Sequence, residues 1–358
     1  MATTQAKIEA QELLADPRYY LFDTLPEQGQ TRFLMTNERE LAAAPFVDIR
    51  FEPQATRDFL VNSQELVALM SQHAVERPKT NFIFHHAFVC STLLARCLNQ
   101  IPAFYSLKEP WILRRLADIK RQHAGTIPEP HWREMINTYM PLLAKQYKSG
   151  ESLVIKASNV ANNLLYDVLN YLPEQPILYM HSDIAEFLVS NLKKPAETQR
   201  KMPGLLADFA KDSDISAVLE SFPMPTSRTL LQTCALIWVR NIHTLKQAAS
   251  KYGTERLRCL DMADFLSSPK ASLNAVSVHF GHVPSEHDMV KMTASEVLGK
   301  NAKDTRYRYD SALKSEEEQR ILAANRQEID DIVEWVTPLV DGLDLHDFLH
   351  ENRLMRSA

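Results

Sequence analysis

The sequence predicts an α/β fold, a three-layer domain with a central parallel sheet and helical additions. The main observation is an alternation between residues 80 and 192. Short apolar runs alternate there with segments whose apolar residues recur at three- and four-residue spacing, the pattern of strands connected by helices. A later strand and two long helical segments, 226–252 and 315–336, follow. The expected strands lie near residues 81–85, 103–107, 152–156, 176–181 and 256–260.

The first strand leads into a loop that is suited to binding an anion. A strand at Phe82 to Phe84 is followed by small and polar residues, and Ser91 and Thr92 then open a helix. The first N–H groups of a helix have no intrahelical partner, and the macrodipole places partial positive charge there. The two hydroxyl groups can cap the helix and also donate to a phosphate or sulfate. An ordinary turn with a Ser/Thr cap is the alternative interpretation.

The same loop lacks the residues of a nucleotide-hydrolysing P-loop. That motif reads G-x-x-x-x-G-K-[ST]. Here no glycine occurs between Gly29 and Gly125, and no lysine stands directly before Ser91. A kinase-like, ATP-dependent phosphotransferase is therefore an alternative that the loop disfavours. Whatever the ligand, we expect it at the carboxyl ends of the strands, as in other open α/β sheets.

Residues 87–94 resemble the phosphosulfate-binding loop of sulfotransferases, P-[RK]-S-G-T-T followed by two apolar residues. The hydroxyl pair and the apolar helix start are present, whereas Phe88 replaces the basic residue and Cys90 the glycine. Further matches follow in the family's order. The strand at 176–181 precedes Ser182 and Ser190, at the positions where the family has an arginine and a serine. The segment 256–281 resembles the family's late "LRYEDL…FLG" segment. The resemblance covers roughly residues 80–340 and implies a P-loop NTPase-like, sulfotransferase-like fold.

The resemblance implies transfer of a sulfuryl group from 3′-phosphoadenosine-5′-phosphosulfate (PAPS) to a hydroxyl or amine, with 3′-phosphoadenosine-5′-phosphate (PAP) as product. It implies a base at Glu109, with His85 or His86 in reserve, since Ser158 stands where the small-molecule branch has its histidine. A helix cap before Pro110 is the alternative role of Glu109. Lys108 and Lys156 would place cations near the sulfate. The expected cofactor-binding residues are Cys90, Ser91, Thr92, Leu93, Lys156, Ser182, Ser190, Lys300, Arg306 and Arg308.

Lys300, Arg306 and Arg308 lie in a basic segment of the sequence. Residues 300–308 contain four cations in nine residues, interleaved with Tyr307. The chain as a whole carries a net charge of −5, so a local concentration of lysine and arginine indicates an anionic ligand. In sulfotransferases, a basic loop near this point closes on the 3′-phosphate. A solvated loop is the alternative.

Composition limits the remaining function classes. A net charge of −5 argues against a nucleic-acid binder. The four cysteines show no C-x-x-C spacing, and the histidines lack a second ligand cluster, so we expect reduced thiols and no metal. The first 17 residues lack the features of a secretory signal, and no run approaches ~20 apolar residues, so we expect a cytoplasmic protein without a membrane partner. The acceptor would be a small molecule, a glycan or a peptide, and an oligomer is possible.

The expected organisation is an N-terminal cap or extension at 1–78, a catalytic domain at 79–345 and a C-terminal tail at 346–358. The charged, proline-punctuated stretch at 193–227 is either a solvated connection or a lid over the acceptor site. Because the loop has lost its basic residue and its glycine, a non-catalytic sulfotransferase-like binding protein is a further alternative.

Overall fold

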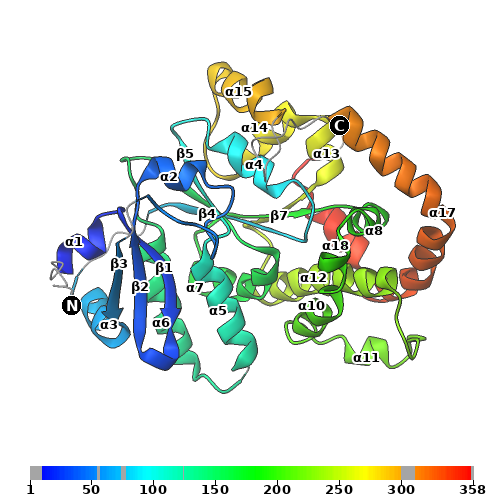
Figure 1. Cartoon of the computed structure of the whole chain (residues 1–358), viewed down its shortest axis with the longest axis horizontal. Helices are drawn as coiled ribbons and strands as arrows, with labels where there is room; N and C mark the ends of the chain where they lie inside the picture. Colours follow the sequence, from blue (N-terminus) through cyan, green and yellow to red (C-terminus); the bar gives the residue numbers. More distant parts are fainter. Residues whose placement is uncertain (1–9, 55–56, 74–77, 124, 300–310, 356–358) are drawn as a thin grey trace.

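A five-stranded parallel sheet forms the centre of the computed structural model, which describes residues 10–54, 57–73, 78–123, 125–299 and 311–355 (Figure 1). The strand order is β5–β6–β4–β7–β8, and all four pairings are parallel. The strands are β4 (Thr80–His85), β5 (Phe104–Lys108), β6 (Ser152–Lys156), β7 (Ile177–His181) and β8 (Leu257–Asp261). The predicted α/β fold and its five predicted strands are therefore confirmed.

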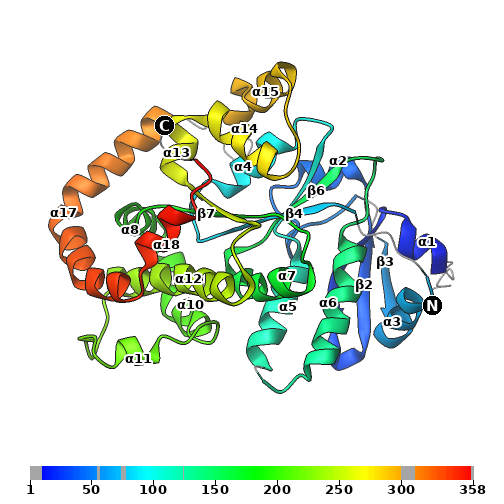
Figure 2. The same cartoon turned by 180° about the vertical axis from the view of Figure 1, so that it is seen from behind.

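The order of the strands determines which helices cover which face. The chain moves from β4 outward to β5, and then in the opposite direction through β6 and β7 to β8. Because crossovers between parallel strands are almost always right-handed, a reversal of direction moves the connecting helix to the other face. Accordingly, α4 (Ser91–Leu98) lies on one face, and α5 (Trp111–Gln122), α7 (Leu165–Tyr171) and α12 (Leu230–Tyr252) lie on the other (Figures 1 and 2).

Each face carries its own hydrophobic core. The face with α4 is completed by helices that follow β8, namely α13 (Met262–Ser267), α14 (Pro269–His279), α15 (Glu286–Met292) and α16 (Ser295–Leu298). The buried side chains of this upper core include Leu94, Leu98, Phe265, Leu273, Phe280 and Met292. The other core is larger, and it also receives α6 (Glu129–Leu143) and the N-terminal residues.

The N-terminal residues form a second, antiparallel sheet that the sequence analysis did not predict. Its order is β1–β2–β3. The elements here are α1 (Ala10–Ala15), β1 (Tyr19–Leu25), η1 (Pro26–Gln28), β2 (Gln30–Met35), α2 (Glu38–Ala43), β3 (Asp58–Asn62) and α3 (Ser63–Gln72). The hydroxyls of Thr24 and Thr31 lie 3.0 and 3.2 Å from that of Tyr139 on α6. The buried ammonium of Lys145 donates to the carbonyls of Leu13, Asp16 and Tyr19, which fastens this sheet to the larger core.

The segment expected as a lid or a connection contains three short helices between α8 (Ile184–Leu192) and α12. They are α9 (Ala196–Gln199), α10 (Met202–Phe209) and α11 (Ser216–Leu219). The side chains of Arg121 and Asp212, 4% and 2% exposed, pair at 2.5 Å and attach the segment to α5. Arg240 donates to the carbonyl of Ser213, which attaches it to α12. Residues 202–213 are thus fixed to the helical layer, and a lid role stays a prediction.

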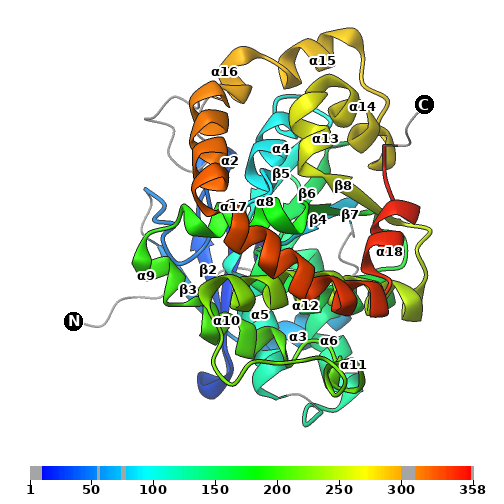
Figure 3. The ribbon, with the colours of Figure 1, turned by 90° about the vertical axis from the view of Figure 1, so that its right-hand side faces the viewer.

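Two helices complete the chain. Figure 3 shows α17 (Ser311–Gly342) crossing α8 and α12 before α18 (Leu345–Glu351), and α17 is kinked at Asn325. Beyond α18, the N–H of Cys259 donates to Asn352 O at 2.7 Å and the N–H of Leu354 to Cys259 O at 2.8 Å, so this segment pairs with the edge strand β8. The expected helix after β6 begins instead as a 3-10 helix, η2 (Asn159–Leu164). Within the described residues, no helix combines the length and apolar character needed to cross a bilayer.

Candidate anion-binding and catalytic site

The topology of the sheet places the expected ligand position at the carboxyl end of the central strand, β4. The connection from β4 leads to one side of the sheet, and the connection from β6 leads to the other. Such a reversal leaves a space between adjacent loops at the strand ends, where open α/β sheets bind their ligands. The loop of residues 86–90, which joins β4 to α4, is at this point. The structure therefore brings the predicted anion loop to the position that the topology favours.

Two residues of this loop adopt a left-handed backbone although neither is glycine. Phe88 has φ 72° and Cys90, the N-cap residue of α4, has φ 59°. This conformation costs an L-residue about 1–2 kcal/mol, and such strain is concentrated at ligand sites. Cys90 stands where the resembled motif has glycine. The loop thus makes its left-handed turns without glycine, the residue that adopts them most easily, and it leads into the buried Ser91 and Thr92.

The two predicted reserve bases, His85 and His86, are buried against the backbone of this loop. His86 Nε2 accepts from the N–H of Ser182 at 2.8 Å, so its hydrogen is on Nδ1, 3.0 Å from Ala87 O. Burial lowers the pKa of His86 to about 4. His85 faces a carbonyl on each side, His86 O at 2.7 Å and Ala157 O at 3.0 Å. Burial and the Lys156 ammonium hold the pKa of His85 well below its usual range. Both rings stabilise the loop, and His86 has no lone pair left for a substrate proton.

Glu109 lies beyond β5 and forms an ion pair with Lys156. Its backbone is left-handed, with φ 56°, and its N–H donates to Lys156 O at 2.7 Å. Its carboxylate oxygen Oε1 accepts from Lys156 Nζ. The Lys156 side chain is 1% exposed, whereas that of Glu109 is 19% exposed. Pro110 is the N-cap residue of α5, with no side-chain capping bond, so Glu109 does not cap that helix. The structure thus joins two predicted site residues from neighbouring strands.

Lys108 has a different environment from the one that its position suggested. Its ammonium donates to Ala42 O, 2.6 Å away at the end of α2, and the residue is 1% exposed. Burial, with a smaller effect of Arg96, lowers the pKa of Lys108 to about 8. The side chain therefore fastens the N-terminal residues to the sheet.

The end of β7 is rich in carboxylates. Ser182 is buried, and its hydroxyl donates to Asp183 O at 3.1 Å, while Ser190 is half-buried on α8. Burial, followed by the charges of Asp261 and Asp183, raises the pKa of Glu186 to about 7. Burial also raises the pKa of Asp261. The described residues thus give this end of the sheet an acidic character. Lys300, Arg306 and Arg308, predicted to meet the 3′-phosphate, lie outside the described residues.

The N-terminal residues border the site, which the sequence analysis missed. The N–H of Val47 donates to Lys108 O at 2.7 Å, and Val47 O accepts from the N–H of Trp111 at 3.0 Å. This segment therefore crosses directly beside Glu109. The ring of Phe46 lies 5.8 Å from Lys156 Nζ, and the Arg50 guanidinium lies 4.6 Å from the same ring. A cluster of aromatic residues in the first 51 positions was the only sequence signal of this contact.

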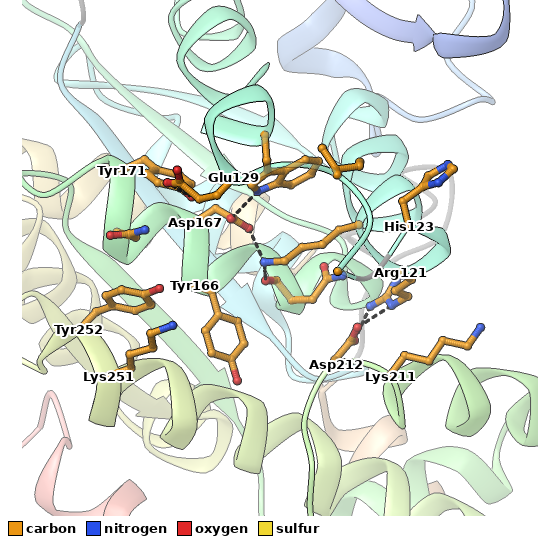
Figure 4. Close-up of a pocket in the computed structure, with 16 residues that line it drawn as sticks. Arg121, His123, Glu129, Tyr166, Asp167, Tyr171, Lys211, Asp212, Lys251 and Tyr252 are labelled. Carbon is orange, nitrogen blue, oxygen red and sulfur yellow. Dashed lines mark hydrogen bonds and ion pairs between the residues drawn. The ribbon is translucent and has the colours of Figure 1, made fainter. Parts of the chain in front are cut away.

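A separate cleft of about 540 Å³ lies between α5, α6, α7 and α12 (Figure 4). Asp167 forms an ion pair with Lys120 at 2.7 Å and accepts from Trp132 Nε1 at 2.6 Å, and the Arg121–Asp212 pair lies nearby (Figure 4). Helix α5 begins two residues after Glu109 and its 12 residues span about 18 Å, and the cleft lies at the far end of this helix. None of the predicted site residues that the structure describes lines this cleft.

Within the part of the chain that the structure describes, no three His, Cys, Asp or Glu side chains are arranged to hold a metal ion. The four cysteines are free thiols, and Cys97, Cys234 and Cys259 are buried. The carboxyl edge offers the hydroxyls of Ser91 and Thr92, backbone N–H groups and the ion pair between Glu109 and Lys156. These are the groups needed to bind an anion and to accept a proton.

No protein-family model matches the chain, and no curated protein matches it. Among solved structures, it is similar to sulfotransferases. The sulfotransferase domain from the curacin biosynthetic pathway aligns with 70% of this chain and 98% of its own, at 12% identity and a TM-score of 0.41. The sulfotransferase of Alicyclobacillus acidocaldarius aligns with 75% and 97%, at 15% identity and a TM-score of 0.39. A mouse sulfotransferase complexed with PAP aligns with 81% and 94%, at 11% identity and a TM-score of 0.40. These similarities are low and assign no residue a role.

Proposed function

We propose that this protein is a sulfotransferase that moves a sulfuryl group from PAPS to a hydroxyl or amine acceptor. The observation that supports the proposal is the juxtaposition, at one edge of the sheet, of the loop predicted to bind an anion and the carboxylate of Glu109. The loop ends in Ser91 and Thr92, and His85 at its start contacts Ala157 O, next to Lys156. Lys156 in turn binds Glu109. A continuous series of contacts thus connects the anion loop to the candidate base.

The donor set of the loop suits the phosphosulfate end of PAPS. The N–H groups of the first turn of α4 and the hydroxyls of Ser91 and Thr92 are donors without a formal charge, as a helix N-terminus supplies for phosphate or sulfate. The absence of a lysine directly before Ser91 disfavours ATP. The 3′-phosphate of PAPS is expected at the end of β7, where Ser182 lies beside carboxylates. Binding of this phosphate therefore depends on the cations Lys300, Arg306 and Arg308. PAPS, when bound, supplies an activated sulfuryl group with PAP as the leaving group.

The residues of the chain then have separate tasks. Ser91, Thr92 and the loop N–H groups bind the anion. Glu109 takes the proton of the acceptor on Oε2, since Oε1 is bound by Lys156. Lys156 is a positioning residue, because a buried ammonium strongly favours retention of its carboxylate partner. Phe46 and Arg50 border the acceptor, which is a small molecule, a glycan or a peptide.

A non-catalytic binding protein of the same fold is the second candidate. Its supporting observation is the carboxylate cluster of Asp183, Glu186 and Asp261, where an enzyme of this class needs to hold the 3′-phosphate. If this candidate is correct, the protein binds PAP weakly or not at all, and it transfers no sulfate.

Titration calorimetry with PAP, adenosine 5′-phosphosulfate and ATP tests the proposal. We expect PAP to bind at least tenfold more tightly than ATP. Replacement of Arg306 and Arg308 by alanine should weaken PAP more than adenosine 5′-phosphosulfate, which lacks the 3′-phosphate, while Lys201→Ala, at an exposed ion pair, serves as the control. Equal affinity for PAP and ATP, or no affinity for PAP, would refute it.

A further inference from the structure

We propose that the cleft between α5, α6, α7 and α12 is a saccharide-binding site (Figure 4). This inference does not depend on the proposed sulfate transfer. The volume of the cleft, about 540 Å³, falls in the range of about 300–1,000 Å³ for small-molecule sites. Its lining combines half-buried tyrosine rings, side-chain amides and paired charges. A ring that bears several hydroxyl groups fits this combination better than an apolar ligand or a polyanion.

Three tyrosine rings provide the flat surfaces of the cleft. Tyr166 and Tyr171 lie on α7 and Tyr252 is the last residue of α12, and all three are half-buried (Figure 4). The hydroxyl of Tyr166 donates to Gln247 Oε1 at 3.0 Å, and that of Tyr171 donates to Glu129 Oε1 at 3.1 Å. These bonds orient two of the rings before a ligand arrives. The C–H face of a sugar ring packs on such a surface, because an aromatic side chain presents an apolar body with a polar tip.

The charged side chains in the lining are largely neutralised by ion pairs. The pairs are Lys120–Asp167, Arg121–Asp212, Glu129–Arg133 and Lys211–Asp208, at 2.7, 2.5, 2.7 and 3.5 Å. Lys251 is exposed, with its ammonium 5.1 Å from the centre of the Tyr252 ring. A phosphate group requires several cations that are not already bound to carboxylates. A hydroxyl group both donates and accepts hydrogen bonds, so it suits a lining in which the two kinds of group alternate.

A buried acceptor in the wall of the cleft also indicates a hydroxyl-rich ligand. Asn163 is 2% exposed, and its Nδ2 donates to Ala117 O at 3.1 Å. Its Oδ1 has no hydrogen-bond partner within the residues that the structure describes. A buried acceptor is costly when it stays unpaired, and it usually holds a water molecule or a ligand group. A sugar hydroxyl supplies the missing donor, either directly or through one bridging water.

A second cleft extends the first, which favours a ligand of more than one ring. It has a volume of about 570 Å³, and Tyr166 and Lys251 line both clefts. Gln247, the partner of the Tyr166 hydroxyl, lines the second cleft. His243 in its wall is 7% exposed, and among the described residues its Nδ1 has no hydrogen-bond partner either. We therefore expect an oligosaccharide whose rings occupy both clefts, with Tyr166 at their junction.

Calorimetry on the full chain with cellotetraose, maltotetraose and chitotetraose tests this assignment. At least one of them should bind, and at least tenfold more tightly than its own monosaccharide. Tyr166→Ala should weaken that tetrasaccharide at least tenfold and Tyr252→Ala at least threefold, because each removes a ring. Tyr166→Phe keeps the ring and should retain the affinity within about threefold. Tyr147→Ala, at a half-buried tyrosine outside both clefts, is the matched control and should bind within twofold of wild type.

Melting curves establish that each variant is folded during the titration, and Tyr166→Leu replaces Tyr166→Ala if the latter is not. No binding of any tetrasaccharide at millimolar concentration overturns the assignment. So does binding that Tyr166→Ala leaves unchanged, or an equal loss in Tyr147→Ala. Adenosine 5′-monophosphate provides the remaining test. If it binds more tightly than every tetrasaccharide and is lost in Tyr166→Ala, the cleft is a nucleotide site and the assignment is wrong.

PAP separates this inference from the proposed function. Tyr166→Ala should bind PAP within twofold of wild type, because the cleft lies at the end of α5 that is away from Glu109. A wild type that binds a tetrasaccharide but not PAP refutes the proposed function and supports the saccharide site. A wild type that binds PAP but no tetrasaccharide does the reverse.

Discussion

Neutralising Glu109 and Lys156 separately and together distinguishes the structural role of this ion pair from its catalytic role. Glu109→Gln leaves the ammonium of Lys156, 1% exposed, with an amide oxygen in place of a carboxylate. Breaking a buried ion pair lowers the free energy of unfolding by about 3–5 kcal/mol. Because the amide oxygen that Glu109→Gln introduces still accepts a hydrogen bond, we expect this variant to lower it by about 2–3 kcal/mol. Lys156→Met leaves a carboxylate that is 19% exposed, and this should cost about 1–2 kcal/mol.

The double variant has no unpaired charge and should lose only about 1 kcal/mol, since an apolar replacement of a buried pair is often nearly neutral. The coupling energy is then about 2–4 kcal/mol, at or slightly above the upper end of the range for residues in direct contact. Urea denaturation at pH 7 of the wild type, the two single variants and the double variant measures this coupling energy. A coupling energy below about 0.5 kcal/mol would show that the pair does not form in solution.

Turnover provides the second measurement of the same four proteins. Sulfate transfer from labelled PAPS to a panel of phenols, sugars and tyrosine peptides identifies an acceptor for wild type. Glu109→Gln should then reduce turnover about 10²–10⁴-fold, the range for loss of a positioned base. The double variant should regain stability without regaining turnover. A Glu109→Gln enzyme with nearly full turnover would refute the assignment of the base.

Two further predictions concern stability. Burial lowers the pKa of His86 and His243 to about 4 and that of His181 to about 3, while an unfolded histidine titrates near 6.5. The unfolded chain therefore binds more protons below pH 6.5, so the unfolding free energy should fall as the pH falls, by up to about 2 kcal/mol per histidine between pH 6.5 and 5. Urea denaturation at pH 7 and at pH 5 measures this loss of unfolding free energy. His181→Phe should make the loss smaller, whereas the exposed His123→Gln should leave it unchanged. Equal stability of the wild type at both pH values would contradict the reasoning. Asp212→Asn should lower the free energy of unfolding by about 2–3 kcal/mol, because among the described residues it leaves the buried Arg121 with Asp118, at 3.5 Å, as its one remaining carboxylate partner. Glu197→Gln, at an exposed pair, should cost less than about 0.5 kcal/mol, and a similar loss in both variants would show that burial does not strengthen the effect.

The parallel sheet was predictable because its strands are short apolar runs separated by helical periodicity. The β1–β2–β3 sheet was not, and the burial of β1 explains this. Six of its seven residues are buried, so the strand shows no alternation of apolar and polar residues. Without that sheet and helix α2, which lies between its strands β2 and β3, Ala42 could not be predicted as the partner of Lys108.

The candidate site was predictable as a set of positions but not as a set of contacts. Ser91 and Thr92 were identified because they open a helix soon after a predicted strand. Glu109 and Lys156 were implied by the resemblance to sulfotransferases, and both lie near the carboxyl ends of predicted strands, which meet at one edge of a parallel sheet. The pairing of Glu109 with Lys156 depends on two strands lying side by side. The backbone of Cys90 could not be predicted from the sequence either. It adopts a left-handed φ at a position where the resembled motif has glycine, and a cysteine does not indicate that conformation.

The division of the hydrophobic side chains into two cores has a consequence for synthesis of the protein on the ribosome. The upper core joins α4 to helices α13–α16, which follow it by roughly 160 residues or more. At a translation rate of about 5–20 residues per second, the apolar face of α4 waits ~8–30 s for its covering helices. The opposite core receives α5, α6 and α7 much earlier. The nascent chain therefore passes through a stage in which the opposite face is already partly covered while the apolar face of α4 is still exposed, and at that stage it depends most on chaperones.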